Sequence, residues 1–312
     1  MPRALVTGAS GFVGPYLVQH LLDLGYEVVG GVHGLGARLP RGCSTVRLDV
    51  TNEEAVQRAV AEIRPDEIYH LAGLSRPASE ALGQFYAVNF GGALNLLEAV
   101  REEEPEAAVL LVGSAYAYGR VDRPIAETDP LAPVNHYGVS KAAADMLGRS
   151  YALVGLRVVN VRPFNHSGVG QSLDFLLPTL VEQFAEIKAR RREPSVKVGN
   201  LRSVRDLSDV RDVVRAYVLA LHKGRPGEAY NVGSSQGTSV RELFELVRRE
   251  AGIEVRLEVE PSRMRATDIP YLVADTQKTS MELGWEPEVP LEKTIRDMLD
   301  AAIRVPAGYS EE

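Results

Sequence analysis

A tyrosine and a lysine four residues apart offer the clearest acid–base chemistry in this sequence of 312 residues. Tyr137 and Lys141 stand at positions i and i+4, so a helix places both side chains on one face. A free phenol titrates at about 10, and a nearby ammonium group lowers that pKa by favouring the phenolate. We expect Tyr137 to exchange a proton with a carbonyl or alcohol oxygen while a nicotinamide exchanges hydride with the same carbon. Lys141 can also bind the nicotinamide ribose.

Ser114 follows directly after an apolar run that predicts a strand at 107–112. Ligands of open α/β sheets gather at the carboxyl ends of the strands, where its hydroxyl would hold the substrate oxygen beside the phenol. Taken singly, each residue has an ordinary alternative role: an amphipathic tyrosine, a surface lysine and a turn serine. Their order along the chain favours a catalytic set of Ser114, Tyr137 and Lys141.

A glycine-rich turn near the N-terminus separates the first predicted strand from the first predicted helix. Glycines at 8, 11 and 14 form the pattern G-x-x-G-x-x-G, which permits a tight turn, a close approach of a pyrophosphate, and tight helix–strand packing. The free N–H groups of the helix would bind the phosphates. The alternative is a plain tight turn. The predicted cofactor contacts in this turn are Gly8, Ser10, Gly11, Phe12, Val13 and Gly14.

The end of the second predicted strand, 27–32, indicates which dinucleotide binds. No acid stands there to bind the ribose hydroxyls of NAD(H), and His33, Arg38 and Arg41 follow instead. This favours NADP(H) over NAD(H), although both arginines can equally be solvated loop charges. Further cofactor contacts are expected after the third and fourth strands, from Asp49, Val50, Leu71, Ala72 and Gly73, with Tyr137 and Lys141 at the nicotinamide.

The elements that must position these residues alternate between strand and helix. Short apolar runs predict strands at 4–6, 27–32, 46–48, 67–71, 107–112, 157–161, 196–198 and 228–232. Helical periodicity predicts helices at 12–24, 53–63, 85–103, 137–153, 173–192, 210–222, 240–251, 276–283 and 291–303. We therefore predict the α/β class, with a Rossmann-type doubly wound parallel sheet and a smaller C-terminal α/β substrate lobe. Residues 1–165, joined by about 203–232, would bind the dinucleotide, and 166–312 would mainly bind substrate.

Composition excludes several other classes of protein. The net charge of -7 argues against a nucleic-acid partner, because phosphate backbones are bound by basic surfaces. No apolar run is long enough to span a bilayer, and no signal-peptide pattern precedes the first strand, so we expect a cytoplasmic protein without a membrane partner. Cys43 is the single cysteine, which rules out an intrachain disulfide. No metal site is predicted.

Together these motifs resemble the extended short-chain dehydrogenase/reductases. The resemblance rests on the glycine turn, Asp49, Asn89, Ser114, Tyr118-Gly119, Tyr137 with Lys141, and the segment 162–165. The second half is most similar to the GDP-mannose branch. Within this branch it is most similar to the reductases of GDP-4-keto-6-deoxymannose, and it is also related to the 4,6-dehydratases. The similar segments are 164–166, 168–172, 198–201, 204–206, 209–212, 230–233, 265–268 and 283–285.

The resemblance implies a set of substrate contacts. Arg205 and Arg265 would hold the diphosphate of a sugar nucleotide, as arginine forks onto phosphate oxygens. Asn165 would contact the sugar or its phosphate, and Asn200 lies in a matching segment. Asp268 would accept hydrogen bonds from guanine, which implies a GDP-linked sugar; its alternative role is a helix cap or an ion pair with Arg265.

One position departs from the branch. The dehydratases carry a glutamate two residues after the catalytic serine or threonine, and this chain has Tyr116 there. A phenol is a poor substitute for that carboxylate base, so dehydration is disfavoured. The reductases often keep an acid in this segment as well, so Tyr116 departs from them too. A reductase, however, needs only hydride, a phenol and positioning.

Three functions are compared against these sequence features. The first is NAD(P)H-dependent reduction of the 4-keto group of a GDP-4-keto-6-deoxyhexose. The second is a nucleotide-sugar 4-epimerase that uses the same residues and retains NAD. The third is a dinucleotide-binding scaffold without activity, against which the intact triad argues.

The resemblance also implies a homodimer. It would form through the helices at 85–103 and 137–153, where Ala93, Leu94, Leu97 and Val100 make an apolar stripe. The alternative is that this stripe simply faces the sheet.

Overall fold

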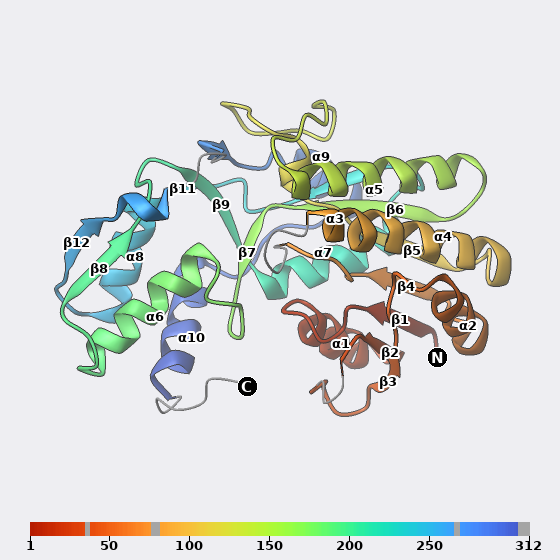
Figure 1. Ribbon diagram of the computed structural model, residues 1–312, viewed down its shortest axis with the longest axis horizontal. Helices are drawn as coiled ribbons and strands as arrows, with labels where there is room; N and C mark the ends of the chain where they lie inside the picture. The colour runs from red at the N-terminus through yellow and green to blue at the C-terminus, as the bar shows by residue number, and fades with distance from the viewer. Residues whose placement is uncertain (35–37, 76–81, 265–268, 305–312) are drawn as a thin grey trace.

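A computed structural model describes residues 1–34, 38–75, 82–264 and 269–304 (Figure 1). Its largest element is a seven-stranded sheet in the order β3-β2-β1-β4-β5-β6-β10, in which every pairing is parallel. The strands are β1 (Arg3–Thr7), β2 (Glu27–Val32), β3 (Ser44–Arg47), β4 (Glu67–His70), β5 (Ala108–Val112), β6 (Val158–Pro163) and β10 (Ala229–Val232). This sheet, with helices on both faces, confirms the predicted α/β fold.

Helices bury both faces of the sheet. Val6 packs with α1 (Gly14–Asp23) and α7 (Val210–Lys223), while its neighbour Leu5 packs with α2 (Glu53–Ile63), α4 (Gly92–Glu103) and α5 (His136–Leu153) on the opposite face. Successive strand side chains point to opposite faces, so burial of both explains why these strands are continuous apolar runs. The carboxyl ends of β1, β4 and β5 are thereby held rigidly at one edge, where the site lies.

The apolar stripe on α4 belongs to this core. Ala93, Leu97 and Val100 are fully buried, and Leu97 and Val100 pack in the cluster that also holds residues of α2. Of the two alternatives for this stripe, the structure supports the one in which it faces the sheet. The exposed apolar residues of this region lie on and just after α5 instead: Val139, Met146, Leu153 and Val154.

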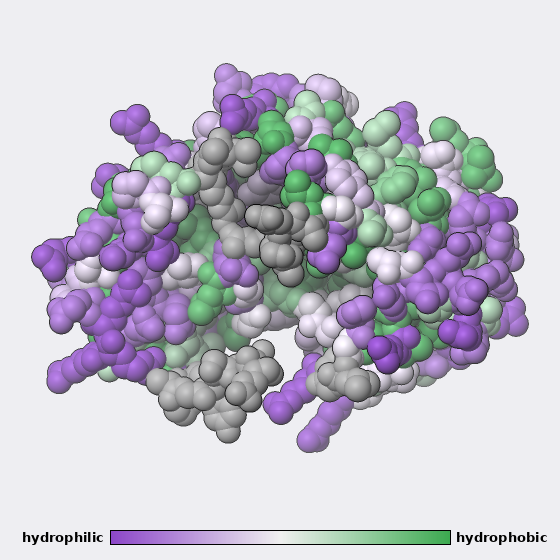
Figure 2. Space-filling view, viewed as in Figure 1, coloured by the Kyte–Doolittle hydropathy of each residue, from purple (hydrophilic) through white to green (hydrophobic). Residues whose placement is uncertain are grey.

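A second lobe has its own core, and it lies at the left of Figure 1. It contains α6 (Leu176–Lys188), α8 (Val240–Ala251) and α10 (Leu291–Arg304), with the parallel strands β8 (Ser195–Val198) and β12 (Arg256–Val259). Helix α8 begins with a capping box in which Ser239 and Glu242 bond each other's backbone N–H groups. Figure 2 shows that the surface is hollowed between this lobe and the larger one.

A small mixed sheet joins the two lobes. Strand β9 (Val204–Asp209) pairs in parallel with β7 (Asn165–Ser167) and β13 (Tyr271–Leu272), and antiparallel with β11 (Gly237–Ser239). The sequence patterns predicted none of these four strands, nor β12. Strands β7, β11, β12 and β13 have only two to four residues, too few for a clear pattern, and in β9 polar residues interrupt the apolar ones.

The predicted helix at 85–103 is three consecutive segments. A short helix α3 (Gly83–Phe85) runs into a π-helical segment η1 (Tyr86–Gly91), which continues as α4. Single π turns are rare and often found at functional sites. In the part of the chain that the structure describes, no helix combines the length and apolarity required to cross a membrane.

Candidate active site

Ser114, Tyr137 and Lys141 come from two elements that meet at the carboxyl end of β5. Ser114 caps the short helix η2 (Ala115–Ala117) and accepts the N–H of Tyr116 at 3.2 Å, while the Asn135 side chain caps α5 by accepting the Gly138 N–H at 2.8 Å. The two elements touch closely, since a Cβ atom at position 138 would lie 2.4 Å from the Tyr116 carbonyl oxygen. A glycine is therefore required there to bring Tyr137 next to Ser114.

Two aromatic rings hold the phenol of Tyr137. The Phe85 and Tyr116 rings lie 6.0 and 5.9 Å from it, centroid to centroid. Burial raises the pKa of Tyr137, a hydrogen bond with the Ser114 side chain lowers it, and the neighbouring Tyr116 phenol raises it further. In the protein alone this phenol therefore stays protonated, and the lowering of its pKa by Lys141 that the i, i+4 spacing predicted is not seen.

Lys141 is a buried cation. Its Nζ donates to the Val112 carbonyl oxygen at 2.8 Å, and burial lowers its pKa to about 8. A Cβ atom on Gly73 would lie 3.0 Å from this Nζ. The glycine therefore leaves the space beside the ammonium clear.

A neutral histidine lies behind this lysine. His70 ends β4, and its Nδ1 is 2.9 Å from the Thr7 hydroxyl, which accepts the Ala72 N–H at 3.2 Å. Burial, and then the charge of Lys141, lower the pKa of His70 to about 3. Its Nε2 is buried with no hydrogen-bond partner among the described residues. The protein thus buries the imidazole uncharged close to a cation.

Asn89 is a positioning residue that sequence reasoning noted only as part of the family motif. It is buried in the π-helical segment, where its Oδ1 accepts the Leu74 N–H at 2.7 Å and its Nδ2 donates to the Leu74 carbonyl and to Ser140 Oγ, at 3.0 and 2.9 Å. Ser140 in turn donates to the Tyr137 carbonyl at 2.8 Å. Asn89 thus ties the loop after β4 to the helix that carries the phenol.

A buried ion pair fixes the same helix from the other side. Asp145, four residues after Lys141, accepts two hydrogen bonds from Arg162 on β6, at 2.7 and 2.8 Å. Arg162 also donates to the Tyr118 hydroxyl at 2.8 Å, just after η2. One guanidinium group therefore anchors both elements of the catalytic set.

The glycine turn between β1 and α1 is built on close backbone approaches. Gly8 has a φ of +66°, and a Cβ atom there would lie 2.7 Å from the Ala72 backbone. A Cβ on Gly14 would lie 2.1 Å from the Ala9 carbonyl oxygen. No side chain caps the start of α1, and Ser10 and Gly11 are exposed there. The free N–H groups of this helix start fit an anion.

The predicted adenosine contacts lie beyond β2 and β3. Asp49 accepts two hydrogen bonds from Thr51, which lower its pKa, and its Oδ2 is 3.9 Å from His33 Nδ1. Arg38 is exposed, and Val50 is buried against Gly92. Leu71 and Ala72 are half-buried after β4.

The substrate candidates lie on the mixed sheet and beyond it. Asn165 pairs in register with Leu207, two residues after Arg205, so Asn165 and Arg205 share one face of the sheet. The Asn165 Oδ1 is buried with no hydrogen-bond partner among the described residues, whereas Arg205 donates to the Ile269 carbonyl at 2.7 Å. Asn200 is exposed and accepts the Arg202 N–H. Arg265 and Asp268 fall outside the described residues.

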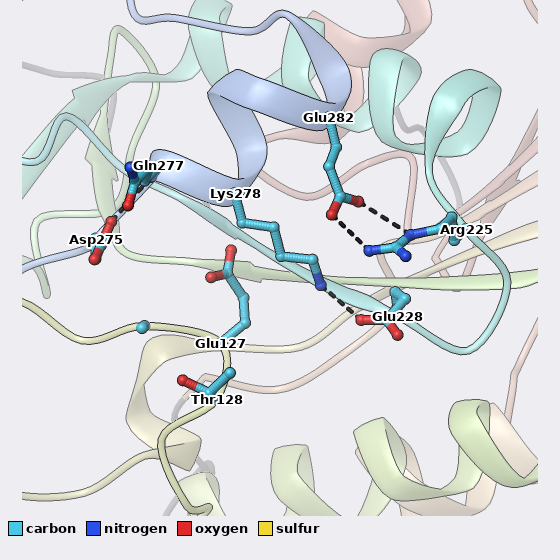
Figure 3. A pocket seen from close by; sticks show the side chains of 9 residues that line it. Glu127, Thr128, Arg225, Glu228, Asp275, Gln277, Lys278 and Glu282 are labelled. Atoms are coloured by element: carbon cyan, nitrogen blue, oxygen red, sulfur yellow. Dashed lines mark hydrogen bonds and ion pairs between the residues drawn. The ribbon is translucent and has the colours of Figure 1, made fainter.

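A separate cavity of about 380 Å³ lies beside β10 and α9 (Gln277–Leu283) (Figure 3). Its two cations are already paired: Lys278 with Glu228 at 2.7 Å, and Arg225 with Glu282. Its other charged lining residues, Glu127 and Asp275, are acidic. This cavity therefore lacks the positive charge that a diphosphate requires, and it contains none of the catalytic set.

Comparison with known proteins assigns the family. The family model described as GDP-mannose 4,6 dehydratase matches residues 5–298. The chain belongs to this family of extended short-chain dehydrogenase/reductases. The family includes both chemistries to which the motifs point, so membership alone does not choose between them.

Relatives in this family carry several activities. The chain is 33% identical over 303 residues to a GDP-6-deoxy-D-mannose reductase of Pseudomonas aeruginosa, covering 95% of this chain and 96% of that protein. It is 32% identical to a UDP-glucose 4-epimerase of Streptomyces lividans, covering 99% and 98%. Identities this similar do not separate the activities.

Solved structures of the family match along nearly the whole chain. RMD of Pseudomonas aeruginosa complexed with NADPH superposes with a TM-score of 0.83 at 30% identity, covering 97% of this chain and 98% of that one. A UDP-glucose 4-epimerase of Thermus thermophilus with NAD gives 0.85 at 30% identity, covering 96% and 98%. This extended dehydrogenase/reductase is therefore an NAD(P)-dependent enzyme that modifies nucleotide sugars.

Proposed function

We propose that the enzyme reduces the 4-keto group of a GDP-4-keto-6-deoxyhexose, as a GDP-6-deoxy-D-mannose reductase does. The observation that carries the proposal is the Tyr116 ring packed against Tyr137, at the position where the resemblance puts a dehydratase carboxylate. The relative at 33% identity supports the same reaction. Its substrate contacts would be Asn165, Asn200, Arg205, Arg265 and Asp268.

The side chains divide the work of such a reduction. Ser114 Oγ orients the ketone oxygen, and Tyr137 delivers its proton to that oxygen as negative charge develops there. The bound nicotinamide supplies the hydride. The ammonium group of Lys141 stabilises the phenolate that Tyr137 becomes after it has given up its proton. Arg205 and Asn165 hold the sugar nucleotide from the mixed sheet.

We also propose NADP(H) as the favoured cofactor, held at the turn by Gly8 to Gly14. No carboxylate ends β2, and Arg38 is exposed beyond it. Asp49 Oδ2 lies 3.9 Å from His33 Nδ1. The acid nearest the end of β2 therefore lies beside a side chain that can carry a positive charge. Binding assays of both reduced cofactors to Arg38→Ala test this, since loss of the arginine should weaken NADPH more than NADH.

Two further proposals concern the larger organisation. Residues 1–165 with about 203–232 would form the dinucleotide-binding part, and 166–312 mainly the sugar-nucleotide part. A homodimer would form through α5, whose exposed face carries Val139, Met146 and Leu153. Figure 2 shows apolar residues at the upper right, where α5 ends.

The experiment is a reductase assay with purified protein, NADPH and GDP-4-keto-6-deoxymannose, followed by cofactor absorbance and by product analysis. We expect cofactor loss matched by GDP-6-deoxyhexose formation. Turnover of another ketosugar nucleotide, without turnover of GDP-4-keto-6-deoxymannose, would refute the proposal.

The second candidate is a nucleotide-sugar 4-epimerase, favoured by the epimerase relatives at 32% and 30% identity. It predicts NAD retained through purification and interconversion of UDP-glucose and UDP-galactose without added cofactor. A 4,6-dehydratase is disfavoured by Tyr116.

A further inference from the structure

Tyr116 differs from the other aromatic neighbour of Tyr137 in one respect. Phe85 and Tyr116 flank the phenol at nearly equal distances, 6.0 and 5.9 Å. Phe85 is buried, at 5% exposure, whereas Tyr116 is half-exposed. Of the two rings that hold Tyr137, Tyr116 is therefore the one that also presents a surface outside the core.

The backbone around Tyr116 is fixed. Its N–H donates to Ser114 Oγ at 3.2 Å, and its carbonyl oxygen packs so closely on α5 that position 138 must be glycine. The next two residues complete the 3-10 turn with N–H bonds to the Ser114 and Ala115 carbonyls, both at 3.1 Å. The Tyr116 ring is thus held on a rigid turn, two residues from Ser114 and in contact with the ring of Tyr137.

The other side of the Tyr116 ring is apolar. It packs against a buried cluster that joins β5 and β6 to the mixed sheet and includes Tyr118, Phe164, Ile269 and Leu272. None of the hydrogen bonds among the described residues uses the Tyr116 hydroxyl. The ring therefore acts at this place through its apolar body.

These contacts locate the ring relative to a bound substrate. A reacting carbonyl oxygen must lie within hydrogen-bond reach, about 3 Å, of both the Ser114 and Tyr137 hydroxyls. A ring in contact with Tyr137 and two residues from Ser114 then lies beside a carbon next to that carbonyl. The two carbons next to C4 of a 4-ketohexose are C3, which carries a hydroxyl group, and C5, which carries C6; the apolar body of the ring matches C6 of a 6-deoxy sugar, which is a methyl group, better than it matches the C3 hydroxyl.

We propose that Tyr116 is a specificity-determining residue whose ring forms an apolar wall against C6 of the hexose and selects a methyl group over a hydroxymethyl group. This inference rests on the proposed 4-keto chemistry. A methyl group packs on such a wall without losing any hydrogen bond, whereas a hydroxymethyl group loses its hydrogen bonds to water there. Discrimination of this kind is worth about tenfold or more.

The test uses two substrates that differ only at C6: GDP-6-deoxy-D-mannose and GDP-D-mannose, oxidised at C4 by NADP⁺. In this direction the hydride would go from C4 to the cofactor, and the C4 hydroxyl proton would go to Tyr137 in its phenolate form, so the assay is run at alkaline pH. We expect the wild type to prefer the 6-deoxy sugar, and Tyr116→Ala to lower that ratio of kcat/KM about tenfold. Tyr116→Phe keeps the ring and should keep the ratio within about twofold.

Phe85→Leu is the matched control. It removes a ring at the same distance from Tyr137 that is buried, so it should lower turnover of both sugars and leave their ratio unchanged. An unchanged ratio in Tyr116→Ala, or an equal shift in Phe85→Leu, would overturn the inference, because Tyr116 would then only support Tyr137.

The same design separates this inference from the proposed function. If the wild type oxidises neither GDP sugar, the proposed function fails, and the ratio is measured instead on UDP-glucose and UDP-6-deoxyglucose. Affinities of each pair, measured by calorimetry with NADP⁺ present, give the ratio without turnover. A preference for the 6-deoxy sugar that depends on the ring supports the wall in either case, and its absence from every pair rejects it.

Discussion

Lys141 and His70 are two buried nitrogen bases of the candidate active site, and the charge of Lys141 disfavours a second positive charge on His70. Burial lowers the pKa of both, to about 8 and about 3, and Lys141 contributes to the shift of His70. Burial also raises the pKa of Tyr137, and a hydrogen bond with Ser114 lowers it. Burial is thus the largest cause of the pKa shift in all three side chains.

Removal of the Tyr137 hydroxyl tests the acid–base role. Tyr137→Phe should lower kcat by about 10² to 10⁴-fold, the usual contribution of a positioned proton donor, with little change in thermal stability. Steady-state kinetics and a melting curve measure the two effects. Activity within about tenfold of the wild type would instead show that the Tyr137 hydroxyl is not the proton donor.

Acid should destabilise the fold through His70. Its pKa is about 3 in the folded protein and about 6.5 in the unfolded chain. Below pH about 6.5 the unfolded chain binds a proton that the folded protein refuses, so stability falls as pH drops toward 3. The slope approaches about 1.4 kcal/mol per pH unit.

Denaturant unfolding of the wild type and His70→Phe between pH 7 and 4 measures that slope. The variant should lack this component, since phenylalanine does not titrate. Thr7→Val is the control, because it removes the hydrogen-bond partner but keeps the buried imidazole; it should lower stability at every pH and keep the slope. Equal slopes in the wild type and His70→Phe would show that another group causes the acid sensitivity.

Local spacing was sufficient to select Ser114, Tyr137 and Lys141 as candidates, because the pair lies on one helix and the serine ends a strand. Asn89 and Arg162 are different. Their contacts join residues that are far apart in sequence: Asn89 with Ser140, and Arg162 with Tyr118. No pattern within a window of the chain contains that information.

At the scale of elements, close backbone approaches determine where the site residues stand. The turn between β1 and α1 depends on Gly14, as a Cβ there would lie 2.1 Å from the Ala9 carbonyl. The sheet and its helices could be predicted because apolar periodicity marks elements that are buried on one or both faces. Strands β7 and β9 could not, since polar residues such as His166 and Asp206 interrupt any apolar pattern.

Alanine substitutions at Gly11 and Gly14 should distinguish a glycine needed for cofactor binding from a glycine needed for stability. Gly14→Ala forces α1 away from β1 and should lower the free energy of unfolding by about 1–3 kcal/mol, as overpacking does. At Gly11 the nearest atom to an added Cβ is the Gly8 carbonyl oxygen, at 3.3 Å. Gly11→Ala should therefore cost less stability while weakening cofactor binding. Unfolding without cofactor and cofactor titrations measure the two; equal destabilisation would contradict this division.

At the scale of the whole molecule, exposed apolar surface indicates where copies would meet. Met146 and Leu153 are 64% and 83% exposed and lie seven residues apart on α5, hence on one face. Exposed large apolar side chains that share one helix face are a feature of surfaces that bind a partner. Leu96, Leu97 and Val100 of α4 do not contribute, because they face the core, and Leu94 is only half-buried.

Charge on this stripe should dissociate the proposed dimer. Met146→Glu with Leu153→Glu is expected to give a monomer in sedimentation experiments at concentrations where the wild type is dimeric, because two carboxylates would be buried unpaired at the interface. Met281→Glu is the control, since Met281 is equally exposed but lies on α9. A monomeric wild type would refute the dimer, and a dimeric double variant would place the interface elsewhere.

The position of strand β10 in the sheet determines when the sheet can be completed during synthesis of the chain. It is the outermost strand beside β6, yet it comes after β7, α6, β8 and β9 in sequence. Until residue 232 has left the ribosome, β6, which is buried along its whole length in the finished protein, has an open apolar edge. Such edges pair readily with other chains. Expression of residues 1–165 alone should therefore give aggregates, because the larger sheet is complete only after a part of the second lobe has been synthesised.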